Sequence, residues 1–187
     1  MLEEEHCSTC NNENEEFYLK LKSEAEDVLF KEPEMAFLVR ENILSPDTRS
    51  FEEAVAHVLC NRLLISSEND TEKGNHNNGS NFCSLRNPET FFQLTLKCMH
   101  SKVIEHGSTM AEAIRADAMA VLERDPATDS LLEVVLFAKG YSALVAHRVA
   151  YRLWLMERKF AALFVQSQTS AGTFRSLGCL LINRYSR

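Results

Sequence analysis

The residues best placed for chemistry in this chain lie in one acidic corner and on one later helical segment. Arg124-Asp125-Pro126 ends a helical pattern with a carboxylate directly before a proline. A second pattern opens at Lys139-Gly140 and contains His147 and Arg148. A carboxylate can hold a polar substrate, but an aspartate before proline more often accepts local backbone hydrogen bonds in a turn. On residue type alone, a turn-forming role for Asp125 is therefore favoured.

Histidines could act as general bases at several positions, but no motif pairs one of them with a nucleophile. The chain has no Gly-x-Ser-x-Gly elbow and no glycine-rich phosphate loop. A single histidine on a helix is more often packed or half-exposed than catalytic. The candidates are His57, His100, His106 and His147. We predict no catalytic residue from these patterns.

Metal binding is suggested only by His6 and a Cys7-x-x-Cys10 pair near the N-terminus. A structural zinc site needs four ligands, and no second cysteine pair of suitable spacing follows. Cys98 and His100 are close in sequence, but residues two apart on a helix point in different directions. We therefore predict no metal site. The cysteines are expected to be free thiols, as is usual in a cytosolic protein.

Basic residues gather in the later helical segments. Arg148 and Arg152 are spaced i, i+4 and share one helix face. The favoured interpretation is ion pairing with Glu133 or with the acidic N-terminal helices, and the alternative is contact with an anion or another subunit. The full basic set is Lys139, Arg148, Arg152, Arg158 and Lys159.

Composition narrows the class of protein. The 187 residues carry a formal net charge of −7, which disfavours a nucleic-acid partner. No window approaches the roughly 20 apolar residues of a membrane-spanning helix. The acidic N-terminus resembles neither a secretory signal nor an organelle transit peptide. We expect a cytoplasmic protein with neither a membrane nor a nucleic-acid partner.

Apolar periodicity predicts an all-α fold, a multi-helix bundle of about seven or eight helices. Residues 1–14 are expected to form a disordered acidic tail, and residues 15–170 a helical domain. Within that domain, residues 66–81 are expected to be a flexible polar insert. Residues 171–187 are expected to form a divergent C-terminal tail.

Start and stop signals place several helix ends. Asn87-Pro88 predicts a helix start, and Gly107 its end. Ser108 or Thr109 is predicted to cap the next helix, with Glu112 three or four residues further on. The most periodic segment runs from residue 141 to residue 157. Its expected buried face is Tyr141, Leu144, Val145, Val149, Leu153 and Met156.

Six segments, taken in order, resemble the N-terminal helical domain of serine acetyltransferases. The most specific are residues 117–126 and 139–148, which contain the Arg-Asp-Pro corner and the Lys-Gly helix start. The other matching segments are Glu24-Ala25-Glu26-Asp27, Glu32-Pro33-Glu34, residues 51–63, and Leu153-Trp154 with Arg158-Lys159 and Gln166-Ser167. Each segment is weak alone, but their order makes the resemblance specific over about residues 24–170.

The resemblance implies a helical domain followed by a left-handed parallel β-helix of hexapeptide repeats. It also implies trimers that join into hexamers through the helical domains. Acetyl-CoA would be the co-substrate, and a histidine in the β-helix would act as general base on serine. The aspartate of the Arg-Asp-Pro corner helps to hold the substrate serine in the family. This role falls on Asp125.

The resemblance ends after residue 170, because residues 171–187 contain no hexapeptide period. We therefore expect a truncated serine O-acetyltransferase that makes no O-acetylserine by itself. No cofactor is expected in the chain itself. The alternative is a non-catalytic helical module that self-associates or joins full-length serine acetyltransferase as a hetero-oligomer.

Overall fold

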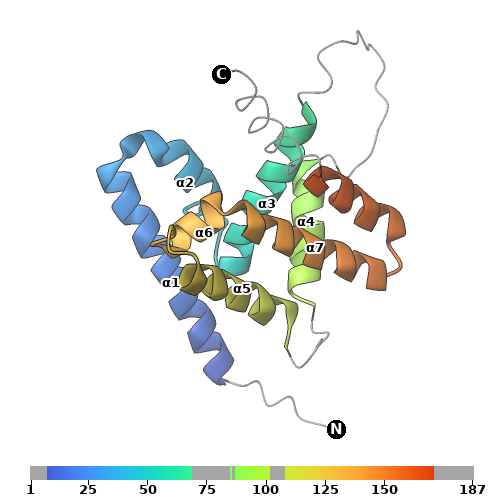
Figure 1. The fold of residues 1–187 in the computed structure, drawn as a ribbon, viewed down its shortest axis with the longest axis horizontal. Helices are drawn as coiled ribbons and strands as arrows, with labels where there is room; N and C mark the ends of the chain where they lie inside the picture. Colours follow the sequence, from blue (N-terminus) through green and yellow to red (C-terminus); the bar gives the residue numbers. More distant parts are fainter. Residues whose placement is uncertain (1–7, 69–84, 86, 102–107, 171–187) are drawn as a thin grey trace.

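The computed structural model describes residues 8–68, 85, 87–101 and 108–170, and it confirms the all-α prediction over these ranges, which contain helices and no β-strand (Figure 1). The elements are α1 (Ser8–Lys31), the 3₁₀ helix η1 (Pro33–Met35), α2 (Ala36–Asn42), α3 (Phe51–Glu68), α4 (Pro88–Met99), α5 (Met110–Arg124), α6 (Leu131–Phe137) and α7 (Lys139–Leu155). Residues 159–170 are also helical. No helix among the described residues is long and apolar enough to cross a membrane.

The helices enclose one apolar core. α3 and α4 pack along each other, α7 lies against α4 and α5, and the short helix α6 packs on both α1 and α5 (Figure 1). α6 is almost entirely apolar, and five of its seven residues are buried, as expected for a central helix. The largest fully buried side chains are Phe51, Phe91, Leu21, Ile43, Leu59, Met99, Ile114, Leu131 and Leu153.

Several predicted boundaries differ from the structure, among them those of α7, which runs from Lys139 to Leu155 instead of from residue 141 to residue 157. α1 begins at Ser8 instead of residue 15, because glutamates are good helix formers and extend a helix that Leu21 and Ala25 anchor in the core. α3 continues to Glu68, so residues 66–68 of the expected insert are helical, and its remaining residues, 69–81, lie outside the described residues. The division into domains and tails stays a prediction.

α4 ends at Met99 instead of Gly107, which lies outside the described residues. The N–H of His100 donates to the carbonyl of Leu96 at 2.8 Å, and the N–H of Ser101 donates to that of Cys98 at 3.2 Å. The last turn is thus tightened to i→i−3 bonding, which closes the helix.

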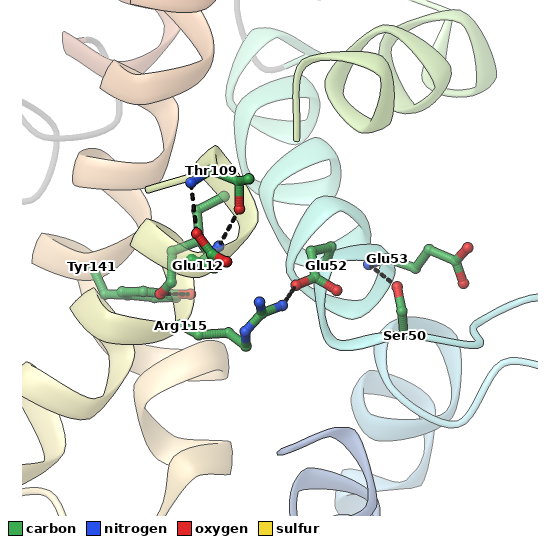
Figure 2. Close-up of polar contacts among 8 residues, drawn as sticks. Ser50, Glu52, Glu53, Thr109, Glu112, Arg115 and Tyr141 are labelled. Atoms are coloured by element: carbon green, nitrogen blue, oxygen red, sulfur yellow. Dashed lines mark hydrogen bonds and ion pairs between the residues drawn. The ribbon is translucent and has the colours of Figure 1, made fainter. Parts of the chain in front are cut away.

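The predicted N-caps are confirmed. Oδ1 of Asn87 accepts from the N–H of Glu89 at 2.9 Å at the start of α4. At the start of α5, the N–H of Glu112 donates to Oγ1 of Thr109 at 3.3 Å, and the N–H of Thr109 donates to Oε2 of Glu112 at 2.7 Å (Figure 2). This reciprocal capping box fixes the entry to α5.

The buried face of α7 differs slightly from the prediction. Ala146 and Ala150 belong to it, whereas Leu144 is 39% exposed and Met156 is only partly buried. Small side chains let the helix approach its neighbours closely, which turns the buried stripe toward the alanines and leaves Leu144 at its edge.

The turn after α7 is a Schellman motif with a glutamate at its left-handed position. Glu157 has φ 59°, and its N–H donates to the carbonyl of Trp154 at 3.0 Å. The N–H of Arg158 donates to the carbonyl of Leu153 at 2.9 Å. Glycine is the usual residue here, because a Cβ in this conformation is strained.

We expect Glu157→Gly to raise the free energy of unfolding by about 0.5–1 kcal/mol, because relief of the strained φ outweighs the chain entropy that glycine adds to the unfolded state. Urea denaturation of both proteins measures the change. Glu157→Ala keeps a Cβ and is the matched control, for which no gain is expected. A Glu157→Gly protein less stable than the wild type would contradict the assigned strain.

Candidate functional site

Asp125 forms the C-cap of α5 at an exposed corner. Its Oδ1 accepts from the N–H of Ala127 at 3.0 Å, and its carbonyl accepts from the N–H of Thr128 at 3.1 Å. The side chain therefore forms the local turn that residue type predicts. Among the described residues, Oδ2 has no hydrogen-bond partner, so the corner can still present a carboxylate oxygen to a ligand.

The orientation of α5 decides where this corner points. Arg115 of α5 forms an ion pair with Glu52, which lies in the first turn of α3 (Figure 2). The two side chains are only 14% and 6% exposed, so the pair lies within the packed interface. Removal of one partner would leave an uncompensated charge there.

Two further contacts join α5 to α7. The buried hydroxyl of Tyr141 donates to the carbonyl of Ile114 at 3.3 Å, and burial raises the pKa of Tyr141 well above its usual value, so the donor keeps its proton. Nε of Arg148 donates to Oδ2 of Asp117 at 2.6 Å, and its Nη2 donates to Oδ1 at 3.0 Å. This two-point contact fixes both the spacing and the rotation of the helices.

The favoured interpretation of the basic residues included an ion pair with Glu133. Arg148 pairs with Asp117 instead. Glu133 accepts from the N–H of Asp129 at 2.9 Å and lies in the first turn of α6. A second carboxylate reaches the same helix start from α1, where Oε2 of Glu24 accepts from the N–H of Leu132 at 2.8 Å. Carboxylates are favoured at this end of a helix by its dipole.

The Asp117–Arg148 pair lines a groove of about 530 Å³ between the start of α5 and α7, together with His147, Tyr151 and Arg152. Asp117 and Asp125 are eight residues apart in the sequence, about 12 Å along the axis of α5. The two segments that sequence reasoning singled out thus meet through Asp117 and Arg148, two turns from the Asp125 corner.

The histidines form no catalytic pair in the part of the chain that the structure describes. His100 and His147 are exposed, and His106 lies outside the described residues. The ring of His57 stacks on Phe92 with their centroids 4.2 Å apart, and burial lowers the pKa of His57 against the opposing effect of nearby carboxylates. Within the described residues, no hydrogen bond joins the imidazole of any of these three histidines to a serine, threonine or cysteine side chain.

Cys60 and Cys98 are buried free thiols. Burial raises the pKa of Cys60 to about 12 and that of Cys98 to about 11, so neither is a nucleophile near neutral pH. The described residues include no group of three potential metal ligands. His6 and Cys7 lie outside the described residues, so the pair with Cys10 is untested.

Comparison with known proteins supports one family. The model for the N-terminal region of serine acetyltransferase matches residues 83–146. Serine acetyltransferase 3, mitochondrial, of Arabidopsis thaliana is 32% identical over 158 residues, which are 84% of this chain and 34% of that protein. Soybean serine acetyltransferase complexed with serine superposes with a TM-score of 0.65 at 28% identity. The described helices belong to the N-terminal domain of the serine acetyltransferase family.

The match to this N-terminal domain covers most of the chain but only part of each relative. The soybean superposition covers 84% of this chain and 55% of the soybean chain. A serine acetyltransferase of Brucella abortus in complex with coenzyme A has a TM-score of 0.61 at 27% identity, over 82% of this chain and 52% of that one. The shared region is thus helical, as the sequence resemblance implies.

Sequence reasoning missed the contacts that hold α5 within the serine acetyltransferase N-terminal domain. Arg115 lay outside the segments that the sequence singled out, whereas Glu52 and Tyr141 lay in matching segments without any sign of their partners. The only signal was a charged residue at a position of α3 that otherwise faces the core, where a buried partner is required. Asp117 and Arg148 lay in the two most specific segments, but sequence alone did not pair them.

We expect Arg115→Ala to lower the free energy of unfolding by about 3–5 kcal/mol, because Glu52 is left buried without its counter-charge. Replacement of both residues, Arg115→Met with Glu52→Leu, should restore most of this loss. Chemical denaturation of the wild type and the variants measures both changes. A single variant as stable as the wild type would show that the pair does not hold α5.

The half-buried His57 makes the stability of the fold depend on pH. Because burial depresses the pKa of His57 in the folded state, the unfolded chain takes up the proton first as pH falls. Stability is therefore complete above the unfolded-state value of about 6.5 and falls at lower pH. The carboxylates that face His57 and limit this loss are Glu41, Asp47, Glu53 and Glu89.

Unfolding free energies should be measured from pH 7.5 down to pH 5, a range that spans the ordinary histidine pKa of about 6.5. Over this range the free energy of unfolding should fall more for the wild type than for His57→Gln. His147→Gln, at an exposed position, is the control and should follow the wild-type curve. Parallel curves for the wild type and His57→Gln would contradict the depressed pKa.

Proposed function

We propose that this chain takes part in serine O-acetylation, the transfer of an acetyl group from acetyl-CoA to the hydroxyl of L-serine on the route to cysteine. The observation that carries the proposal is an exposed carboxylate at the Arg124-Asp125-Pro126 corner of a serine acetyltransferase N-terminal domain. In this role Asp125 holds the substrate serine, and the contacts of α5 keep its carboxylate in place.

The helical domain by itself is proposed to bind serine weakly and to transfer no acetyl group. Acyl transfer needs a base close to the attacking hydroxyl and a site for the thioester. Among the described residues, the Asp125 side chain accepts one hydrogen bond, from the backbone of Ala127, and burial keeps the thiols of Cys60 and Cys98 protonated. In this proposal the base and the acetyl-CoA site are supplied by a part of the enzyme other than these helices.

A second proposed role is association. Several phenylalanines of the domain are almost fully exposed, which is unusual for side chains that remain in solvent. In this role the domain pairs with further copies or with full-length serine acetyltransferase. The cytoplasmic location stays a prediction, since the Arabidopsis relative is a mitochondrial protein.

The first role predicts a local response to serine. In ¹H–¹⁵N spectra of the purified chain, L-serine should shift the amide signals of Arg124, Asp125, Ala127 and Thr128, with a dissociation constant on the order of millimolar. Asp125→Asn should abolish the shifts, because the amide cannot act as the anionic partner of an amino acid. With acetyl-CoA and serine, neither protein should release CoA thiol above the buffer rate.

Asp129→Asn is the matched control, since Asp129 lies in the same exposed loop and its backbone N–H, not its carboxylate, bonds to Glu133. It should leave the shifts unchanged. Shifts that persist in Asp125→Asn would refute the binding role. Thiol release by the wild type would refute the separation of binding from catalysis.

A further inference from the structure

A basic groove lies between α4 and the turn that follows α7. We use this name for the cavity of about 650 Å³ whose cations are Lys97, Arg158 and Lys159. Its apolar lining includes Leu85 and Phe160, and Glu157 adds a carboxylate. The groove is therefore cationic at its edges and apolar between them, although the whole chain is acidic.

The groove is preformed by the Schellman turn. The backbone bonds of Glu157 and Arg158 hold the Arg158-Lys159 pair at the mouth, and Nζ of Lys159 lies 5.8 Å from the ring centroid of Trp154. The side chain of Phe160 is 85% exposed. An exposed aromatic ring beside fixed cations is typical of a contact surface.

A complementary surface lies at the junction of α1 and α2, which we call the phenylalanine corner. Phe30 is 91% exposed and Phe37 is 80% exposed. They are accompanied by four exposed carboxylates and one exposed lysine. These charged residues are Glu26, Asp27, Lys31, Glu32 and Glu34.

The phenylalanine corner and the basic groove cannot meet within one molecule. Figure 1 places the α1–α2 junction at one end of the long axis and the C-terminal end of α7 at the other. Contact between them therefore requires two molecules. Because the two surfaces differ, the contact is head-to-tail, and it produces a ring if the rotation closes or a chain if it does not.

We propose that the phenylalanine corner of one copy docks into the basic groove of a second copy. Phe30 enters the groove, whose volume of about 650 Å³ exceeds the roughly 150 Å³ of a cavity that holds benzene. The carboxylates around Phe30 then face Lys97, Arg158 and Lys159 across the rim. This inference rests on the proposed association role and specifies its surfaces.

A second copy fits these observations better than a nucleic acid. Nucleic acids are bound through many phosphate contacts by basic proteins, whereas this chain has a net charge of −7. An apolar groove needs an apolar anchor, and the chain itself supplies an exposed phenylalanine with carboxylates around it. Opposite charges at the rim steer the encounter, and the buried ring supplies affinity.

Sedimentation velocity tests the proposal. The wild type should associate below about 100 µM, and Phe30→Ala should weaken association at least about tenfold, as truncation of an anchor residue does. Arg158→Glu with Lys159→Glu should weaken it similarly, and so should Lys97→Glu. In 1 M salt the wild type should associate less, because the screening length falls to about 3 Å.

In a mixture of the two proteins, Phe30→Ala supplies an intact basic groove, and the Arg158→Glu, Lys159→Glu protein supplies an intact phenylalanine corner. The mixture should give dimers and nothing larger. Phe137→Ala, which truncates an exposed phenylalanine on α6, is the control and should associate as the wild type does. Circular dichroism confirms that each variant is folded.

A monomeric wild type at about 100 µM, a concentration well above micromolar dissociation constants, would overturn both the inference and the association role. Association unchanged in Phe30→Ala and in the groove variants would overturn the inference and leave the association role intact. Equal weakening by Phe137→Ala would also overturn it, because the effect would not be specific to the corner.

Discussion

The buried ion pair between Arg115 and Glu52 is the constraint on which the arrangement of α5 depends. Both charges are removed from solvent, so each must find the other for the interface between α5 and α3 to form. The Tyr141 hydroxyl and the Asp117–Arg148 pair then hold the opposite side of the helix against α7. A helix bound on two sides has one allowed orientation, and that orientation determines where the C-cap of α5 lies.

At this corner the two carboxylate oxygens of Asp125 differ in their hydrogen bonding. Oδ1 of Asp125 closes the local turn through the N–H of Ala127, which leaves Oδ2 for a ligand. The turn therefore fixes the carboxylate before any ligand arrives, which lowers the entropy lost on binding. The same rigidity at the end of α7 comes from the Schellman turn at Glu157, which sets the direction of the Arg158-Lys159 pair.

Much of the fold could be predicted from the sequence, because local signals determine it. The capping box of Thr109 and Glu112 and the N-cap at Asn87 are short-range patterns, and both are present. The helix ends at Ser8 and Met99 were not predicted, since the apolar periodicity that marks a helix is weak at both places. The pairing of Arg115 with Glu52 depends on residues 63 apart in the chain, and periodicity carries no information about such contacts.

The hydrogen bond from the N–H of Leu132 to Glu24 joins residues 108 apart. The first helix therefore supplies a cap to α6 from a distant part of the chain. During synthesis on the ribosome, α1 cannot pack against α6 until α6 has emerged. Closure of so long a loop is slow and costly in entropy, so the N-terminal helix is exposed to chaperones and proteases until α6 has emerged.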